Sequence, residues 1–398
     1  MTQSSEDPVV IVSGARTPMG SFQGVFADVT APELGACAIA EAMRRSGISS
    51  DEIADVVMGC VLPAGQGQAP ARQAALKAGL PDSTPATTVN KMCGSGMKAV
   101  MLATDALMAR PRDVLVAGGM ESMTNAPYIL PKMRRGARIG HAEVKDHMFL
   151  DGLEDSFGTG RLMGSFAEDT AERYQMTRAM QDAFATESLK RAQRATSDGS
   201  FTSEIVPVAV TTRKGTATIA HDEQPQTADI AKIATLKPAF RKDGTVTPAN
   251  SSSISDGAAA LILMRASEAK RRKLQPLATI AATSTHAREP AGFTLAPIGA
   301  IEKVLAAAGW QAKDVDLFEI NEAFAVVALA AMRDLDLPHD KVNVHGGACA
   351  LGHPVGASGA RIIVTLLAAM EKYDLRRGVA ALCIGGGEAT AVAIERAA

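Results

Sequence analysis

The stretch NKMCGSGMKAV, residues 90–100, fits two motifs that belong to different chemistries. Gly94 and Gly96 match the pattern G-x-G-x-x-G/A, in which backbone N–H groups bind the phosphates of a dinucleotide. That fingerprint requires an acidic residue at the end of the following strand, whereas Asp113 stands before that strand. Cys93 lies directly before the glycines, at a predicted helix start where the helix dipole and unpaired N–H groups favour a thiolate. The pattern therefore favours a nucleophile over a nucleotide site.

Three other segments supply further groups that a cysteine nucleophile needs. His353 lies in a glycine-rich loop before a predicted helix. Cys383 ends an apolar strand and precedes a glycine loop whose N–H groups could bind an oxyanion. Asn321 comes just after another strand. A lone cysteine is more often buried and inert, but this set of residues favours a catalytic role for Cys93.

The elements that must position these groups alternate between apolar strands and helices, which predicts a layered α/β fold. One helix is expected to follow a cap at Thr30 and to end at Gly47. Cys93 should precede a buried helix that is apolar on most sides. The reactive groups are therefore expected at the ends of strands and at the starts of helices.

Two blocks of the second half repeat the pattern of the first half. Residues 297–324 parallel residues 33–60, and residues 356–389 parallel residues 93–122, both at an offset of roughly 265 residues. Convergent use of strands and helices is one explanation, but two blocks in the same order favour a duplication. We therefore expect two related α/β units whose equivalent ends meet across a pseudo-twofold interface.

A region rich in charge, glycine and polar turns separates the two units. We interpret residues 121–246 as an inserted loop domain. The first core domain would then comprise residues 1–120 and 247–273, with a returning helix and strand over residues 250–264. Residues 274–398 would form the second core domain.

Composition narrows the class of protein. The chain has 398 residues and a net charge of −2, which gives no reason to expect nucleic acid as a partner. No run of about 18 apolar residues indicates a membrane span, and the N-terminus does not resemble a signal peptide. Five cysteines without C-x-x-C spacing argue against a zinc site and a disulfide framework. We expect a cytoplasmic protein without membrane, nucleic-acid or metal partners.

With these motifs in place, the sequence resembles the thiolase family over nearly its whole length. The motifs occur in the family's order: VSGARTPMG, NKMCGSG, NSSSISDGAAA, NEAFA, GGACALGHPVGASG and CIGGG. The resemblance implies an α/β fold of two duplicated core domains in five α-β-α-β-α layers, with an inserted loop domain. It also implies acyl transfer between coenzyme A (CoA) thioesters, with no permanently bound cofactor.

The resemblance implies a role for each reactive group. Cys93 would be acylated and His353 would activate it. Cys383 would move the substrate α-proton, for which a thiol with a pKa near neutral is suited. Asn321 would hold a water that helps to bind an enolate oxygen, and the backbone N–H groups of Cys93 and Gly385 would form a second oxyanion site.

The resemblance also implies contacts with CoA. Ser252 would form a hydrogen bond with the pantetheine arm. The residues implied as the lining of its tunnel are Leu153, Met163, Phe240, Ala323 and Phe324.

The sequence departs from the pattern of short-chain family members at three places, which together comprise four residues. Two of the places concern the length of the acyl chain, and the third concerns the nucleotide end of CoA. Leu162 replaces a common histidine, and Phe293 replaces a common methionine. Pro225 and Gln226 stand where an arginine near the adenine is often found.

A basic cluster in the inserted region has two interpretations. It would usually be a solvated loop. In the family this region ties two dimers together and can lend positive charge to the CoA phosphates, which implies a homotetramer. The cluster consists of Lys132, Arg134, Arg135 and Arg138.

The predicted reaction is the reversible condensation of two acetyl-CoA molecules to acetoacetyl-CoA and CoA, through an acyl-cysteine. A 3-ketoacyl-CoA thiolase of fatty-acid β-oxidation, with longer substrates, is the alternative within the family. A ketoacyl synthase usually pairs its nucleophile with two histidines, so Cys383 and the NEAF motif favour a thiolase. A dehydrogenase that uses NAD(P) is the alternative from another class.

Overall fold

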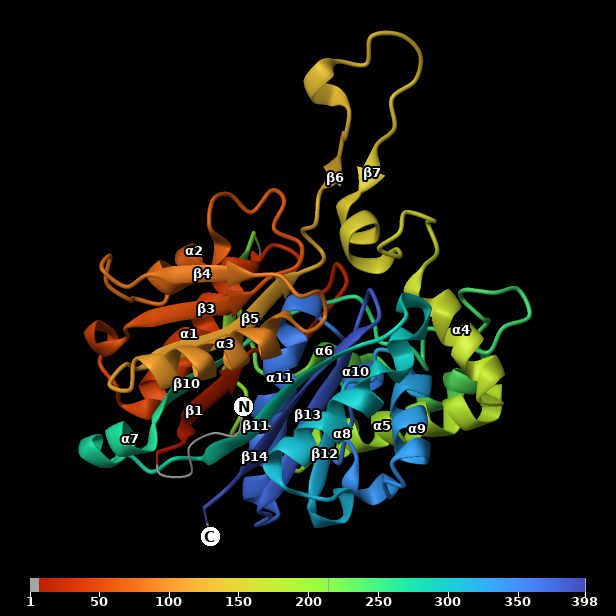
Figure 1. The fold of residues 1–398 in the computed structure, drawn as a ribbon. Coiled ribbons are helices and arrows are strands. Elements are labelled where there is room, and N and C mark those ends of the chain that lie inside the picture. Colours follow the sequence, from red (N-terminus) through yellow and green to blue (C-terminus); the bar gives the residue numbers. More distant parts are fainter. Residues whose placement is uncertain (1–6, 214, 398) are drawn as a thin grey trace.

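The computed structural model describes residues 7–213 and 215–397. Residues 1–6, on which the expectation about a signal peptide partly rests, lie outside the described part. A ten-stranded mixed sheet runs through the molecule in the order β12-β13-β14-β11-β1-β10-β5-β3-β4, and β2 pairs with β10. Two small two-stranded sheets, β6-β7 and β8-β9, are separate from it. The sheet and the helices around it are shown in Figure 1.

The strands are β1 (Val9–Arg16), β2 (Gly20–Ser21), β3 (Asp55–Gly59), β4 (Ala86–Val89), β5 (Leu115–Ser122), β6 (Tyr128–Ile129), β7 (Lys145–Asp146), β8 (Val208–Thr212), β9 (Gly215–Ile219), β10 (Ser255–Arg265), β11 (Ala278–Ala287), β12 (Leu317–Ile320), β13 (Arg377–Ile384) and β14 (Glu388–Glu395). The α-helices are α1 (Ala31–Ser46), α2 (Pro70–Lys77), α3 (Ser95–Ala109), α4 (Met163–Arg173), α5 (Arg178–Ser197), α6 (Glu223–Thr227), α7 (Ala266–Arg272), α8 (Ala296–Ala308), α9 (Ala325–Asp334), α10 (Ala348–Leu351) and α11 (Val355–Lys372). The short 3₁₀-helices are η1 (Ser50–Glu52), η2 (Met133–Arg135), η4 (Ile230–Thr235), η5 (Pro290–Leu295), η6 (Ala312–Asp314) and η7 (His339–Lys341), and η3 (Phe149–Leu153) is a π-helix.

Four strands of each half of the large sheet correspond in order and direction, and the first half carries β4 in addition at its edge. In the first half β3 runs parallel to β5, and β10 lies antiparallel between β5 and β1. In the second half β12 runs parallel to β13, and β14 lies antiparallel between β13 and β11. The halves join through a short antiparallel contact between β1 and β11. This correspondence confirms the predicted duplication.

Helices cover both faces of each half. The helices α3 and α11 pack against each other in the middle of the molecule, α3 on β3 and β5, and α11 on strands of both halves. On the outer sides α1 and α2 cover the first half, while α8 covers the second half and contacts α9. The predicted α-β-α-β-α layers are therefore confirmed (Figure 1).

Local signals set the helix ends as predicted. Glu33 accepts hydrogen bonds from the backbone N–H and hydroxyl of Thr30, at 2.9 and 2.7 Å, and α1 begins at the next residue. The helix ends at Gly47, whose φ of 68° is left-handed. The equivalent helix α8 ends in the same way at Gly309, with φ 72°.

The expected helix at the start of residues 250–264 is wrong. Only the strand β10 is present there, and the preceding serines run alongside the second half. Ser252 donates its backbone N–H to Ala323 O at 2.9 Å, and the hydroxyl of Ser251 donates to Thr247 O at 2.7 Å. Serine side chains compete for backbone partners in this way, which disfavours a helix.

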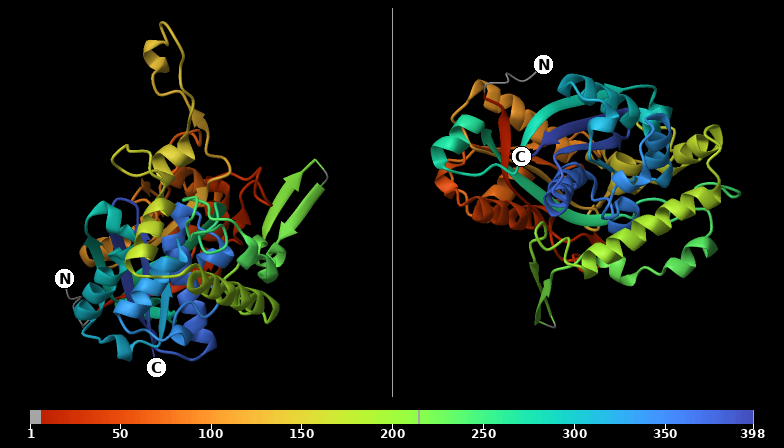
Figure 2. Two further views of the ribbon diagram at one scale, coloured as in Figure 1. Left: turned by 90° about the vertical axis from the view of Figure 1, so that its right-hand side faces the viewer. Right: turned by 90° about the horizontal axis from the view of Figure 1, so that it is seen from below.

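The region between β5 and β10 adds helices and two projections to the core. The β6-β7 pair and the loop between its strands form an arm, residues 127–147, which stands clear of the body (Figure 1). The β8-β9 hairpin projects from another side (Figure 2). Within the described residues, Pro290–Ala308 is the single helical segment with the length and composition of a membrane span, and 56% of it is buried in the protein. The α8 part of this segment packs on β11 and β14, so the segment is a core helix of the protein.

Candidate active site

A cavity of about 330 Å³ opens between the base of the arm, α4 and the second half of the sheet. Almost all predicted site residues line it, although they come from segments far apart in the chain. Those residues are Cys93, His353, Cys383, Gly385, Ser252, Leu153, Met163, Phe240, Ala323 and Phe324.

A tight turn between β4 and α3 presents Cys93. Met92 has a left-handed φ of 47°, and the hydroxyl of Ser95 holds the turn by accepting from Lys91 N at 2.8 Å and donating to Met92 O at 2.7 Å. Gly94 allows the turn to approach the second half closely, because an added Cβ would lie 2.4 Å from the side chain of Ile384. The glycines of the opening motif therefore serve packing.

The resting state of Cys93 differs from the expected thiolate. Burial raises the pKa of the Cys93 thiol above its ordinary value. Hydrogen bonds to the sulfur from the backbone N–H groups of Gly385 and of Cys93 itself act in the opposite direction and are outweighed. Desolvation by the surrounding apolar groups therefore dominates over the position before a helix. To act as a nucleophile, Cys93 would need a base.

His353 has the properties of such a base. It follows Gly352, whose φ of 103° turns the chain into α11, and its ring is buried. Burial and then the positive charge of Arg361 lower the pKa of His353 to about 3, so the imidazole is neutral near pH 7. Its Nδ1 lies 2.6 Å from the hydroxyl oxygen of Ser358, and its buried Nε2 has no hydrogen-bond partner among the described residues. Nε2 is the nitrogen left for proton exchange.

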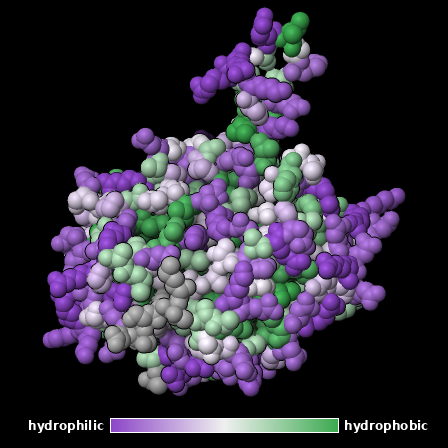
Figure 3. All heavy atoms as spheres, in the orientation of Figure 1, coloured by the Kyte–Doolittle hydropathy of each residue, from purple (hydrophilic) through white to green (hydrophobic). Residues whose placement is uncertain are grey.

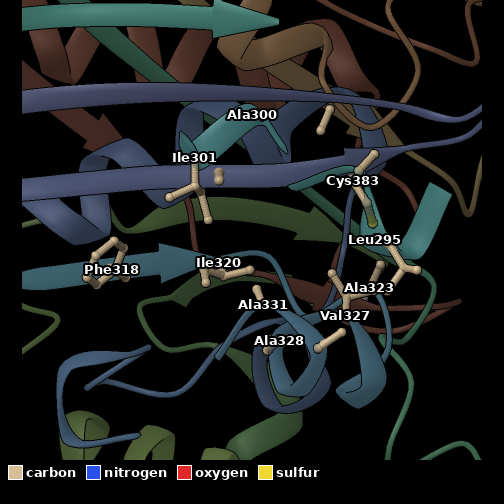
Figure 4. Close-up of a cluster of buried hydrophobic side chains, with 14 of the residues drawn as sticks. Leu295, Ala300, Ile301, Phe318, Ile320, Ala323, Val327, Ala328, Ala331 and Cys383 are labelled. Atoms are coloured by element: carbon tan, nitrogen blue, oxygen red, sulfur yellow. The ribbon is translucent and has the colours of Figure 1, made fainter. Parts of the chain in front are cut away.

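Cys383 lies at the end of β13, with its side chain directed towards the region of Leu295 and Ala323 (Figure 4). Burial raises the pKa of the Cys383 thiol well above its ordinary value, and the nearby Cys93 sulfur raises it further. The expectation of a pKa near neutral is therefore wrong. A resting Cys383 is a neutral thiol, and as a thiolate it would be a strong base.

Asn321 and Ser252 occupy different positions relative to the cavity. Asn321 lies behind the imidazole, with Nδ2 at 3.5 Å from His353 Nδ1, and it does not line the cavity. Its Oδ1 is buried and unpartnered within the described part of the chain, so a water could bind there. Ser252 lines the cavity, and its hydroxyl donates to Ala323 O at 3.0 Å.

The cavity is apolar apart from these groups, and its far wall is aromatic. Phe324 packs edge-on against Phe240 and Phe293, with ring centroids at 6.0 and 6.4 Å. Phe293 also packs edge-on against Phe166, so it is held from two sides. Leu162 and Phe293 both line the cavity. The two substitutions that the sequence singled out therefore lie where an acyl chain would contact them.

Other lining residues were not predicted. Phe149 lies on the π-helix η3, Ile254 lies in the loop before β10 and Val355 is the first residue of α11; the last two stand within the predicted motifs. Each is an ordinary apolar residue, for which the sequence carries no functional signal. Ser358 was also missed, although it stands in the predicted GASG segment.

Three further predictions concern the surroundings of the cavity. Pro225 and Gln226 lie on α6 and do not line it. The four residues of the basic cluster lie exposed on the arm, away from the cavity of their own chain. Within residues 7–213 and 215–397, no three His, Cys, Asp or Glu side chains form a group that could hold a metal ion.

Comparison with known proteins agrees with this arrangement. A family model described as "Thiolase, N-terminal domain" matches residues 9–267, and one described as "Thiolase, C-terminal domain" matches residues 274–396. An acetyl-CoA acetyltransferase of Cupriavidus necator is 49% identical over 390 residues, which are 98% of this chain and 99% of that protein. A mouse protein named cytosolic acetyl-CoA acetyltransferase is 47% identical, over 99% of both chains. A Staphylococcus aureus protein named probable acetyl-CoA acyltransferase is 45% identical, over 98% of this chain and 99% of its own.

Proposed function

Because the chain belongs to the thiolase family, we propose that it is an acetyl-CoA acetyltransferase, which condenses two acetyl-CoA molecules and catalyses the reverse cleavage. One observation carries this proposal: two thiols and a neutral imidazole from three separate segments share one apolar cavity, with two backbone N–H groups at the Cys93 sulfur. The names of the relatives support the short substrate. The dehydrogenase alternative is not consistent with this family.

In the first half-reaction the Cys93 thiol gives its proton to Nε2 of His353 and attacks the thioester carbonyl. The N–H groups of Cys93 and Gly385, which already point at the sulfur, stabilise the oxyanion. The tetrahedral intermediate collapses to acetyl-Cys93 and expels CoA as a thiolate. The Cys383 thiol protonates that thiolate, so free CoA leaves and Cys383 becomes the base.

In the second half-reaction the Cys383 thiolate removes an α-proton from the second acetyl-CoA. Nε2–H of His353, assisted by a water on Asn321, binds the enolate oxygen. The enolate carbon attacks acetyl-Cys93 and releases the Cys93 thiolate, which takes its proton back from His353. All three groups then return to their neutral state, and acetoacetyl-CoA is the product. Ping-pong kinetics are expected.

The acetyl label on Cys93 tests this function. Incubation with radiolabelled acetyl-CoA should label the wild-type protein covalently, and Cys93→Ala should abolish both the label and turnover. Retained label with normal turnover would exclude Cys93 as the nucleophile. Cys383→Ala should retain the label and lose condensation, because Cys383 acts as the α-proton base.

A 3-ketoacyl-CoA thiolase for longer substrates is the second candidate, since Leu162 and Phe293 make the cavity wall apolar. Cleavage rates with 3-ketoacyl-CoAs of rising length distinguish the two. An acetyl-CoA acetyltransferase should act fastest on acetoacetyl-CoA, with rates that fall as the chain grows.

The pantetheine arm is proposed to bind Ser252 and the apolar positions Leu153, Met163, Phe240, Ala323 and Phe324. We also propose an N-terminal core domain of residues 1–120 and 247–273, an inserted domain of residues 121–246 and a C-terminal core domain of residues 274–398.

The arm carries exposed apolar side chains, including Tyr128 at 70% and Ile139 at 96% exposure, which supports contact with another copy in a homotetramer. Figure 3 shows the arm clear of the body, with hydrophobic side chains at its base. All five cysteines are free, which supports a reducing, cytoplasmic location.

A further inference from the structure

Ser358 is a buried hydroxyl that the proposed reaction does not yet use. It lies on the first turn of α11, is fully buried and contacts the ring of His353 through an oxygen 2.6 Å from Nδ1. Its own hydroxyl proton has a partner, because Oγ lies 3.0 Å from the carbonyl oxygen of Pro354, four residues earlier. The carbonyl oxygen can only accept.

These two contacts determine the direction of the short hydrogen bond. With its proton donated to Pro354, the Ser358 oxygen is left as an acceptor, so Nδ1 of His353 must carry the hydrogen. A neutral imidazole holds one ring hydrogen, so Nε2 is then a lone pair. The structure agrees: Nε2 is buried and has no partner among the described residues. The amide of Asn321, at 3.5 Å from Nδ1, is too distant to compete with Ser358.

We propose that Ser358 is a positioning residue that fixes His353 as the Nδ1–H tautomer and thereby keeps Nε2 free to accept the proton of Cys93. This inference rests on the proposed function, in which His353 is the base for Cys93. Ser358 touches neither substrate nor sulfur and acts through His353 alone. It would also stabilise the protonated ring that follows, since Nδ1–H keeps its acceptor throughout.

The pH dependence of Cys93 alkylation by iodoacetamide separates this role from a general packing effect. Near pH 7 the neutral, half-buried thiol depends on His353, so Ser358→Ala should slow alkylation about ten- to hundredfold, the range that one buried hydrogen bond spans. At strongly alkaline pH the thiolate forms without a base, and the variant should approach the wild-type rate. A packing defect would slow alkylation equally at every pH.

Two matched variants complete the experiment. Ser358→Thr keeps the hydroxyl and should recover most of the neutral-pH rate. Thr365→Val removes another buried hydroxyl of α11, one that donates to Glu204, and should leave the pH profile unchanged.

The outcomes distinguish a failure of the proposed role of His353 from a failure of the proposed role of Ser358. If His353→Ala alkylates normally at pH 7, the role of His353 in the proposed function is wrong. If His353→Ala is slow while Ser358→Ala is normal, or if Ser358→Ala is slow by the same factor at all pH values, only the inference about Ser358 is overturned.

Discussion

A single methyl group added at Gly96 should disturb the geometry between Cys93 and His353. Gly96 lies on the first turn of α3, where this helix crosses α11. An added Cβ would lie 2.8 Å from Ala360 N and 3.0 Å from Gly356 O, both of them backbone atoms of α11. Backbone cannot rotate away as a side chain can, so the helices themselves must separate.

The size of the displacement follows from these distances. Ordinary contact begins at 3.4 Å, so α11 must move by about 0.6 Å relative to α3. Such overpacking costs about 1–3 kcal/mol of stability. Because α3 begins just after Cys93 and α11 just after His353, the displacement changes the distance between thiol and imidazole. A misplacement of about 1 Å can cost about 100-fold in rate, so we expect kcat/KM to fall about tenfold or more.

The assay compares Gly96→Ala with Gly14→Ala. Gly14 lies on β1 against the far part of α11, where an added Cβ would be in ordinary contact, 3.4 Å from Val364. The Gly14 variant should keep its activity. For Gly96→Ala, both kcat/KM and the rate of Cys93 alkylation at pH 7 should fall, while the protein remains folded by circular dichroism. A folded Gly96→Ala protein with wild-type values for both would refute the reasoning.

Four further predictions concern the cavity wall, a buried carboxyl group and two groups of residues on the arm. Phe293→Ala should cost about 3–5 kcal/mol in urea unfolding and raise cleavage of longer 3-ketoacyl-CoAs relative to acetoacetyl-CoA; unchanged chain-length preference would remove Phe293 from the acyl site. Burial raises the pKa of Glu319 from its ordinary value of 4.5 to about 8. The neutral carboxyl therefore contributes fully to the stability of the fold below pH 4.5, and this contribution is lost as the pH rises through 8. The free energy of unfolding should therefore fall as the pH rises from 4.5 to about 8 and level off above that, and the fall should be less steep in Glu319→Gln; parallel curves would contradict this assignment. Tyr128→Ser combined with Ile139→Ser should dissociate the proposed homotetramer in sedimentation velocity. Alanine substitutions across the basic cluster should flatten the salt dependence of CoA affinity.

The sequence predicted the meeting of the reactive groups better than it predicted their chemistry. Cys93 and Cys383 could be placed together because a duplicated strand order brings equivalent strand ends to one interface. Their pKa shifts could not be predicted, because desolvation depends on side chains from the arm base, α4 and η5 that only the packed structure brings near. The predicted helix after Cys93 is present as α3, yet burial has a larger effect on the pKa of the thiol than the position before this helix.

The contact between Ser358 and His353 is a second feature of the site that the sequence could not predict. Its spacing of five residues from His353 carries no signal, since a loop residue and a helix residue have no fixed relation. The contact forms because Gly352, at φ 103°, and Pro354 turn the chain so that the imidazole lies over the first turn of α11. The helix that the sequence predicted before β10 is absent for a similar reason. The serines of this segment form hydrogen bonds with neighbouring backbone, and these contacts could not be foreseen from the sequence.

The three shifted pKa values fit one reaction cycle. A cavity that disfavours charge keeps both thiols and the imidazole neutral at rest, which protects Cys93 from unwanted reactions. The same environment opposes a lone thiolate or a lone imidazolium, so each proton transfer must create both charges together, as the pair of His353 and a sulfur. A high pKa would also make Cys383 a strong base once the departing CoA of the proposed cycle has taken its proton. In the proposed cycle condensation therefore depends on the order of events, since Cys383 would become a base only after Cys93 has been acylated.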